Sequence, residues 1–244
     1  MQKYLYKDLY ELEEKHWWHE AKRNLVNFFL SHYLNKKSKI LDVGCGTGRN
    51  IESFSRFGEV WGIDYASEAI TFCKQRGLKR VVRGSLEKIP FLKNSFDCIT
   101  ALDVLEHVDD QKALKEIIRV LKPEGLLIIT VPAYPRLWSR WDEVLQHKRR
   151  YTKSSLKKLL KGNGFKIIKI SYVHSFLILP TIIIRAFKNL FYKNYYPSDF
   201  KLSSKIINFL LYNISQIEKI FIISSSLPFG TSLVAVAKKN YETN

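Results

Sequence analysis

Short apolar runs alternate with amphipathic stretches through the first half of the chain. The apolar runs predict five strands, at residues 39–43, 59–63, 80–83, 96–101 and 125–131. The amphipathic stretches predict helices between them, at residues 49–57, 67–76 and 110–121. The last strand is apolar throughout, as strands buried on both faces of a parallel sheet are. This alternation predicts a doubly wound α/β fold.

The pattern changes after Pro132. Residues 133–151 are aromatic and charged without a clean period, and residues 152–161 predict a helix with a Ser/Thr start and a glycine stop. Residues 165–172 and 232–238 predict two more strands. Between these strands, residues 173–230 are strongly apolar and basic at once, which predicts an inserted cap.

Two apolar segments dominate this insertion, at residues 175–191 and 206–223. Polar residues interrupt both, so neither is expected to reach the 18–20 uninterrupted apolar residues of a bilayer span. We expect hydrophobic helices with basic flanks instead. Such helices lie in a membrane interface, roof a lipid-substrate pocket, form a dimer face or pack into the core, and the sequence leaves these alternatives open.

The length and composition of the chain fit one folded domain with an additional structural element. The 244 residues are 46% hydrophobic and 26% charged, which excludes wholesale disorder. Cys45, Cys73 and Cys98 lie far apart, so we expect buried thiols in a reducing compartment and no disulfide framework. Residues 1–14 are charged and predict no secretory signal.

Basic charge concentrates in the C-terminal part. The chain carries a formal charge of +17, and residues 145–244 hold 17 basic but only three acidic residues. This asymmetry indicates an anionic partner, namely a membrane surface, a phosphorylated substrate or nucleic acid. A solvated Lys-rich surface is the alternative.

A glycine-rich turn follows the first predicted strand. Gly44, Gly46 and Gly48 alternate with other residues, and Asp64 stands twenty residues after Gly44 at the end of the second strand. Glycines let a ligand lie against the backbone, and a carboxylate at this distance binds the ribose hydroxyls of an adenosine group. Arg49 occupies the place where a GxGxxG dinucleotide motif requires glycine.

The turn resembles motif I of class I S-adenosylmethionine (SAM)-dependent methyltransferases. Residues 83–91, 95–108 and 121–126 resemble later motifs of the same family, so the resemblance covers residues 39–131. It implies a Rossmann-like seven-stranded sheet of order 3-2-1-4-5-7-6, SAM as cofactor and an N-terminal lid helix. The cofactor-binding residues it implies are Asp42, Gly44, Cys45, Gly46, Asp64, Tyr65, Ser85, Leu86 and Asp103. Ser85 stands where the family often has Asp.

Two histidines are candidate general bases on the acceptor side. His107 follows the fourth strand, and His147 lies in a segment after the fifth strand, where Asp142 is placed to orient it. Residues 132–151 resemble a subgroup of methyltransferases from cell-surface glycan and lipid-linked sugar pathways. The arginines suit a phosphate or carboxylate. The candidate substrate-binding residues are Trp18, Tyr134, Trp138, Asp142, Arg149, Arg150 and Tyr151.

No metal is expected from the sequence, because no further ligands cluster near His16 and His19. We predict a methyltransferase domain of residues 1–172 and 231–244, with residues 173–230 as a hydrophobic basic cap inserted between strands six and seven. The expected reaction is methyl transfer to O or N of a small-molecule, glycan or lipid-linked acceptor. The alternatives are an RNA methyltransferase and a non-catalytic cofactor-binding partner subunit. The expected location is the cytoplasm, with the cap on an anionic membrane surface or in a homodimer.

Overall fold

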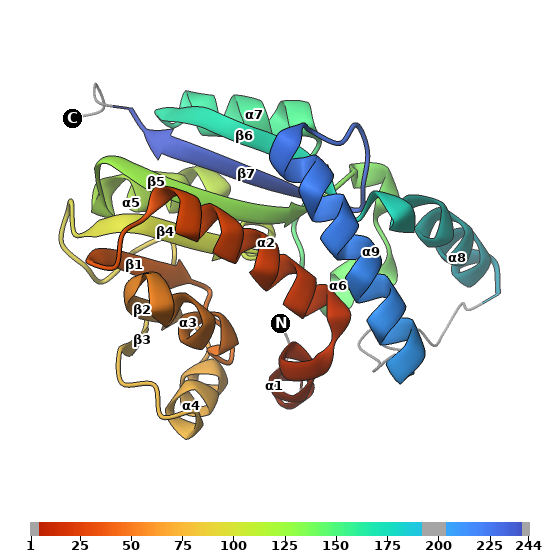
Figure 1. The fold of residues 1–244 in the computed structure, drawn as a ribbon, viewed down its shortest axis with the longest axis horizontal. Helices are drawn as coiled ribbons and strands as arrows, with labels where there is room; N and C mark the ends of the chain where they lie inside the picture. Colours follow the sequence, from red (N-terminus) through yellow and green to blue (C-terminus); the bar gives the residue numbers. More distant parts are fainter. Residues whose placement is uncertain (1–4, 192–203, 241–244) are drawn as a thin grey trace.

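A computed structural model describes residues 5–191 and 204–240. Its centre is a seven-stranded sheet of order β3-β2-β1-β4-β5-β7-β6, which confirms the predicted fold and order (Figure 1). Neighbours from β3 to β5 are parallel, whereas β7 runs antiparallel to both β5 and β6. The strands are β1 (Ser38–Val43), β2 (Gly58–Asp64), β3 (Val81–Arg83), β4 (Phe96–Leu102), β5 (Leu121–Pro132), β6 (Phe165–Val173) and β7 (Ser232–Lys239).

Helices cover both faces of the sheet, as apolar strand faces require. Apolar residues of α2 and α3 pack on one face, and those of α5 and α7 pack on the other (Figure 1). The helices are α1 (Leu5–Lys15), α2 (Trp17–Tyr33), α3 (Arg49–Phe54), α4 (Ser67–Gln75), α5 (Asp110–Val120), α6 (Arg140–Val144), α7 (Lys153–Gly162), α8 (Ile178–Phe191) and α9 (Lys205–Ser224).

Local chemistry explains the helix ends and one difference from the expected strands. Asp109 caps α5 by accepting two backbone N–H groups, and Thr152 caps α7. Strand β5 begins at Leu121, four residues before the predicted start. Leu121 already pairs with Phe96 before the chain bulges out at residues 122–125. The sequence analysis placed residues 122–124 before the strand, as a turn. In the structure, Lys-Pro-Glu-Gly forms an interruption within β5.

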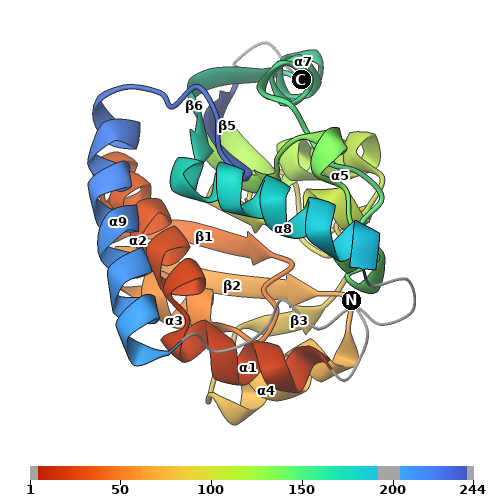
Figure 2. The same ribbon diagram turned by 90° about the vertical axis from the view of Figure 1, so that its right-hand side faces the viewer.

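The predicted insertion holds α8 and α9 between β6 and β7. Helix α9 lies alongside α2 in both views (Figures 1 and 2). The Nδ2 group of Asn24 on α2 donates to the hydroxyl of Tyr212 at 2.7 Å, and the N–H of Trp17 donates to Asn208 at 2.8 Å. These polar contacts fix α9 against α2, although their sequence separation exceeds 180 residues.

The size of α9 corrects one expectation from the sequence. Among the described helices, Lys205–Ser224 is long and apolar enough, by length and composition, to cross a membrane. The error arose because Gln216, Glu218 and Lys219 interrupt the apolar run without lowering its average hydropathy below that of a span. Most of this helix is exposed. Its exposed apolar residues are Ile206, Ile207, Phe209, Leu210, Ile214, Ile217, Ile220 and Phe221.

Candidate active site

The glycine turn after β1 adopts backbone angles that favour glycine. Gly44, Gly46 and Gly48 have φ values of +69°, +55° and +93°. A Cβ atom on Gly44 would lie 2.4 Å from Val104 Cγ2, so no other residue fits there. A Cβ atom on Gly46 would meet Leu9 Cδ2 of α1 at 3.4 Å. The turn is therefore tight, and α1 lies over it.

Asp64 ends β2 beside this turn. Its Oδ2 accepts the N–H of Gly46 at 3.0 Å, and its Oδ1 accepts the N–H of Ala66 at 2.9 Å. Burial raises the pKa of Asp64, while these two amides act in the opposite direction. Each carboxylate oxygen keeps a second lone pair. The carboxylate can thus still accept the two hydroxyls of a ribose.

Asp42, on β1, is a second buried carboxylate. Its Oδ1 accepts the hydroxyl of Thr100 at 2.6 Å, but its Oδ2 has no hydrogen-bond partner among the described residues. Burial raises the pKa of Asp42 to about 7, and the charges of Glu13 and Asp64 add to this. An orphaned buried carboxylate oxygen suits a cationic group. The donor set thus fits SAM, whose ribose offers hydroxyls and whose methionine end carries an ammonium.

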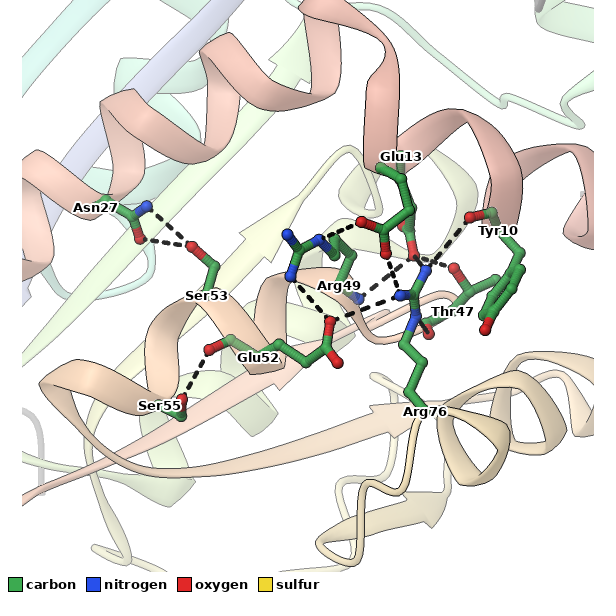
Figure 3. Close-up of polar contacts among 10 residues, drawn as sticks. Tyr10, Glu13, Asn27, Thr47, Arg49, Glu52, Ser53, Ser55 and Arg76 are labelled. Atoms are coloured by element: carbon green, nitrogen blue, oxygen red, sulfur yellow. Dashed lines mark hydrogen bonds and ion pairs between the residues drawn. The ribbon is translucent and has the colours of Figure 1, made fainter.

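Helix α1 is held over the turn by an ion-pair network (Figure 3). Glu13 on α1 accepts the hydroxyl of Thr47 and, at 3.2 Å, pairs with Arg76 Nη2. Arg76 also binds Glu14 and donates from Nε to the carbonyl of Thr47 at 2.8 Å. Arg49 pairs with Glu14 at 2.9 Å. The network ties α1 to α3 and α4, the helices that follow the first two strands.

The predicted adenine-side residues follow β2 and β3. Tyr65 is 74% exposed, with the guanidinium of Arg83 5.8 Å from its ring centroid. The hydroxyl of Ser85 accepts the N–H of Glu87 at 3.1 Å, and Leu86 is buried. Cys45, another predicted contact, is buried together with Cys73 and Cys98, as expected. Direct contact of these residues with SAM stays a prediction.

Across the sheet edge, Lys22 of α2 forms an ion pair with Asp103 beyond β4. Asp103 has a φ of +52° and accepts the hydroxyl of Thr130 at 3.1 Å. Burial lowers the pKa of Lys22 well below its usual range. The ammonium also lies 3.2 Å from the ring centroid of Trp18. Lys22 therefore links a predicted cofactor residue to a predicted substrate residue.

Four rings continue from Lys22 towards the cap, and we call Trp17, Trp18, His174 and Phe176 the aromatic wall. Trp18 lies 6.1 Å from His174, and Trp17 lies 5.9 Å from Phe176, between ring centroids. Burial lowers the pKa of His174 to about 3, so this imidazole is neutral. The wall ends at an apolar pocket lined by Ser175, Phe176, Ile178, Leu179 and Phe229.

The two candidate bases lie side by side, with ring centroids 4.8 Å apart. Nδ1 of His147 lies 2.8 Å from Asp142 Oδ1, and Nδ1 of His107 lies 3.3 Å from the carbonyl of Gln146. Glu106, which is fully buried, lies 3.9 Å from Nε2 of His147. Burial raises the pKa of Glu106 to about 8 and lowers that of His107 to about 3.

Most of the predicted acceptor-side cluster already has partners inside the protein. Arg150 donates to Asp142 at 2.7 Å and to the carbonyl of Ala133 at 3.1 Å. Arg149 pairs with Asp110 at 2.6 Å, and the hydroxyl of Tyr151 donates to the same carboxylate at 2.9 Å. In this geometry Asp142 and Arg150 hold the His147 loop, and their contact with a substrate stays a prediction.

Tyr134 and Trp138 are aromatic members of that cluster. Tyr134 stacks on Tyr172 with ring centroids 5.0 Å apart, and Trp138 is 37% exposed. The sequence analysis missed Lys22, Glu106 and His174. The available signals were the four-residue spacing from Trp18 to Lys22 on one helix and the position of Glu106 beside His107.

Comparisons with known proteins agree with this geometry. A family model described as a methyltransferase domain matches residues 41–129. An uncharacterized protein of Methanocaldococcus jannaschii is 32% identical over 159 residues, which are 64% of this chain and 67% of that protein. A putative methyltransferase of Encephalitozoon cuniculi is 27% identical over 58% of this chain and 60% of its own length. The chain spans half to two thirds of the first curated relatives it matches.

Solved structures share the fold at low identity. A putative methyltransferase of Haloferax volcanii, in complex with the Trm112 methyltransferase activator, has a TM-score of 0.64 at 14% identity and covers 98% of this chain and 97% of its own. A SAM-dependent methyltransferase of Archaeoglobus fulgidus has a TM-score of 0.59 at 21% identity, covering 89% and 94%. Fold, glycine turn and family model define a methyltransferase domain. This domain, residues 41–129, has the class I fold, and SAM is its cofactor.

Proposed function

We propose that this chain transfers the methyl group of SAM to an oxygen or nitrogen of a small-molecule, glycan or lipid-linked acceptor. The observation that carries the proposal is the aromatic wall. It connects the Lys22–Asp103 pair at the cofactor edge of the sheet to the apolar pocket at the start of α8. An amphipathic acceptor can place its apolar part in that pocket and its reacting group near the ion pair.

For this reaction the protein mainly has to position the acceptor atom next to the methyl group of SAM. The acceptor atom forms a bond to the methyl carbon while the carbon–sulfur bond breaks, and the electron pair stays on sulfur. The products are the methylated acceptor and S-adenosylhomocysteine. The site must align the two atoms and exclude water. An oxygen nucleophile must also lose its proton, and His107 and His147 are the candidate bases.

The cap supports a lipid-linked acceptor and a peripheral location on the inner face of a membrane. Exposed apolar side chains on α9 include Phe209, Ile217 and Phe221, and α8 adds Leu179 and Ile183. Polar contacts to α2 and β6 hold α9 on the domain, which favours a helix that lies on a membrane over one that crosses it. Basic residues of the C-terminal part add attraction to anionic lipids. RNA would use the charge but not the apolar face.

Methyl transfer is tested by supplying SAM with a labelled methyl group to total membrane lipid from the native organism, to water-soluble glycans and to structured RNA. The proposal expects label in lipid or glycan. Phe176→Asp should reduce lipid labelling while SAM affinity, measured by calorimetry, is unchanged. Label in RNA alone would establish the RNA alternative. Bound SAM with no transfer to any acceptor would favour the non-catalytic alternative.

Membrane contact is tested by co-sedimentation with anionic and neutral liposomes at low and high salt. We expect binding to anionic liposomes that partly survives high salt, because burial of apolar side chains is not screened. The double variant Ile217→Asp, Phe221→Asp should abolish it. Leu92→Asp is the matched control, since Leu92 is 82% exposed but lies outside the cap. A concentration-dependent dimer that binds no liposomes would assign this face to a second copy instead.

A further inference from the structure

We propose that Glu106, His107 and His147 bind a divalent first-row transition cation, such as Zn²⁺, at the acceptor side of the active site. One potential ligand atom from each residue lies within 4.8 Å of the others. Ligand atoms bound to Zn²⁺ at about 2.0–2.2 Å are roughly 3–3.5 Å apart. Small side-chain rotations therefore suffice to close the site.

Two different segments bring these ligands together. Glu106 and His107 lie in the short 3₁₀ turn Leu105–His107 that follows β4. His147 lies beyond α6, and the N–H of the next residue, Lys148, donates to the carbonyl of Glu106 at 2.8 Å. This backbone contact fixes the position of the His147 loop against the turn. The two backbone segments that carry the three ligand side chains are therefore fixed relative to each other.

Both imidazoles are oriented as metal ligands usually are. Nδ1 of His147 contacts the carboxylate of Asp142, and Nδ1 of His107 contacts the carbonyl of Gln146. Both partners are acceptors, so each Nδ1 carries the hydrogen, and Nε2 is the nitrogen that would coordinate a cation. A carboxylate or carbonyl behind a histidine fixes the tautomer that coordinates metal. Arg150 in turn holds Asp142 in place.

Glu106 is the independent observation that points to a ligand. Its side chain is fully buried, and neither carboxylate oxygen has a hydrogen-bond partner in the part of the chain that the structure describes. The two cations whose fields act on it, Lys22 and Arg150, are already paired with Asp103 and Asp142. A buried carboxylate is costly unless it is paired or coordinates a metal. A cation between Glu106 and the imidazoles removes this cost.

The donor set selects the class of cation. Two imidazoles and one carboxylate suit Zn²⁺, Fe²⁺, Co²⁺ or Ni²⁺ better than Mg²⁺ or Ca²⁺, which prefer oxygen ligands. Three protein ligands leave a coordination position open. Resting on the proposed function, a hydroxyl of the acceptor bound there has a lowered pKa and releases its proton to water. His107 and His147 then act as ligands of the cation and not as bases. The acceptor oxygen then attacks the methyl carbon, and the carbon–sulfur electron pair returns to sulfur.

The test titrates the chelator-treated full chain with Co²⁺ and follows its visible absorption bands. We expect one equivalent to bind with the bands of a nitrogen- and oxygen-ligated site, and Zn²⁺ to displace it. Glu106→Gln, His107→Asn and His147→Ala should each raise the Kd for Co²⁺ by more than about 100-fold, and Asp142→Asn by about 10- to 100-fold. His32→Asn, an exposed histidine on α2, is the matched control and should bind like the parent.

Calorimetric SAM affinity and the thermal unfolding midpoint show whether each variant is folded. His107 is only partly buried, so its variant keeps the test decisive if Glu106→Gln fails to fold. Loss of Co²⁺ with SAM affinity retained supports the site. Absence of a Co²⁺ spectrum in the parent chain, or identical Co²⁺ binding by parent and His107→Asn, would overturn it. Neither result bears on whether SAM binds, so failure of this proposal is distinct from failure of methyl transfer.

Discussion

The carboxylate of Glu218 on α9 accepts the backbone N–H of His174, at the end of β6, at a distance of 2.7 Å. The same carboxylate accepts the N–H of Ser175 at 2.6 Å. Glu218 is buried. Its hydrogen bonds attach α9 to the residues that follow β6, which include His174 of the aromatic wall. One side chain thus couples the position of α9 to the acceptor side of the site.

Glu218→Ala should therefore loosen the cap. The two N–H groups lose a charged acceptor, which costs about 2–4 kcal/mol. Hydrogen exchange of α9 should accelerate while exchange in β1 and β4 stays slow. Asn213→Ala, an exposed substitution on the same helix, should change little. Equal protection of α9 in both variants would show that apolar packing alone holds the cap.

Asp64→Ala should weaken SAM binding. The ribose loses two hydrogen bonds to the carboxylate, so we expect a cost of about 2–4 kcal/mol, or some 30- to 1000-fold in Kd. Isothermal calorimetry measures this directly. Glu124→Gln is a suitable control, because it lies at the start of β5, at the opposite end of the sheet. Unchanged affinity in Asp64→Ala would remove Asp64 from the site.

Arg76→Ala should release α1 from the glycine turn. Arg76 binds Glu13, Glu14 and the Thr47 carbonyl, so its removal leaves the buried Glu13 without its guanidinium partner at a cost of about 3–5 kcal/mol. Chemical denaturation measures this cost, and proteolysis reports release of α1. Arg80→Ala breaks an exposed pair with Glu59 and should cost less than about 1 kcal/mol. Similar costs for the two variants would contradict the conclusion that the ion-pair network holds α1 over the glycine turn.

Asp42 predicts a pH dependence of stability. Its folded pKa of about 7 exceeds that of an unfolded Asp, so between about pH 4 and 7 only the folded chain holds the proton. The contribution of Asp42 to the free energy of unfolding therefore falls by up to about 1.4 kcal/mol per pH unit as pH rises, and levels off above pH 7.

Urea denaturation of parent and Asp42→Asn from pH 5 to 8 isolates this group, because other titrating groups are common to both. The neutral variant should gain stability relative to the parent as pH rises towards 7. Parallel curves would show that Asp42 is already charged in the folded chain.

The sequence by itself determined the sheet and predicted the residues of the cofactor edge. Apolar runs identify strands because burial on a sheet face is a local property of successive residues. Gly44, Gly46 and Gly48 identify the turn because few other residues adopt a positive φ there. Asp64 followed from spacing, because a βαβ unit has a nearly constant length. Strand order came from resemblance to the family, and the structure confirmed it.

Only the tertiary structure decided which charged groups meet. His107 and His147 are forty residues apart, and nothing in periodicity places them beside each other or beside Glu106. The sequence predicts that Arg150 binds a substrate, whereas in the structure its guanidinium donates to Asp142. Hydropathy identifies α9 as an apolar helix, but it does not determine which face of this helix packs against the domain. Periodicity reports the burial of neighbouring residues, whereas these partnerships depend on where distant loops cross the same edge of the sheet.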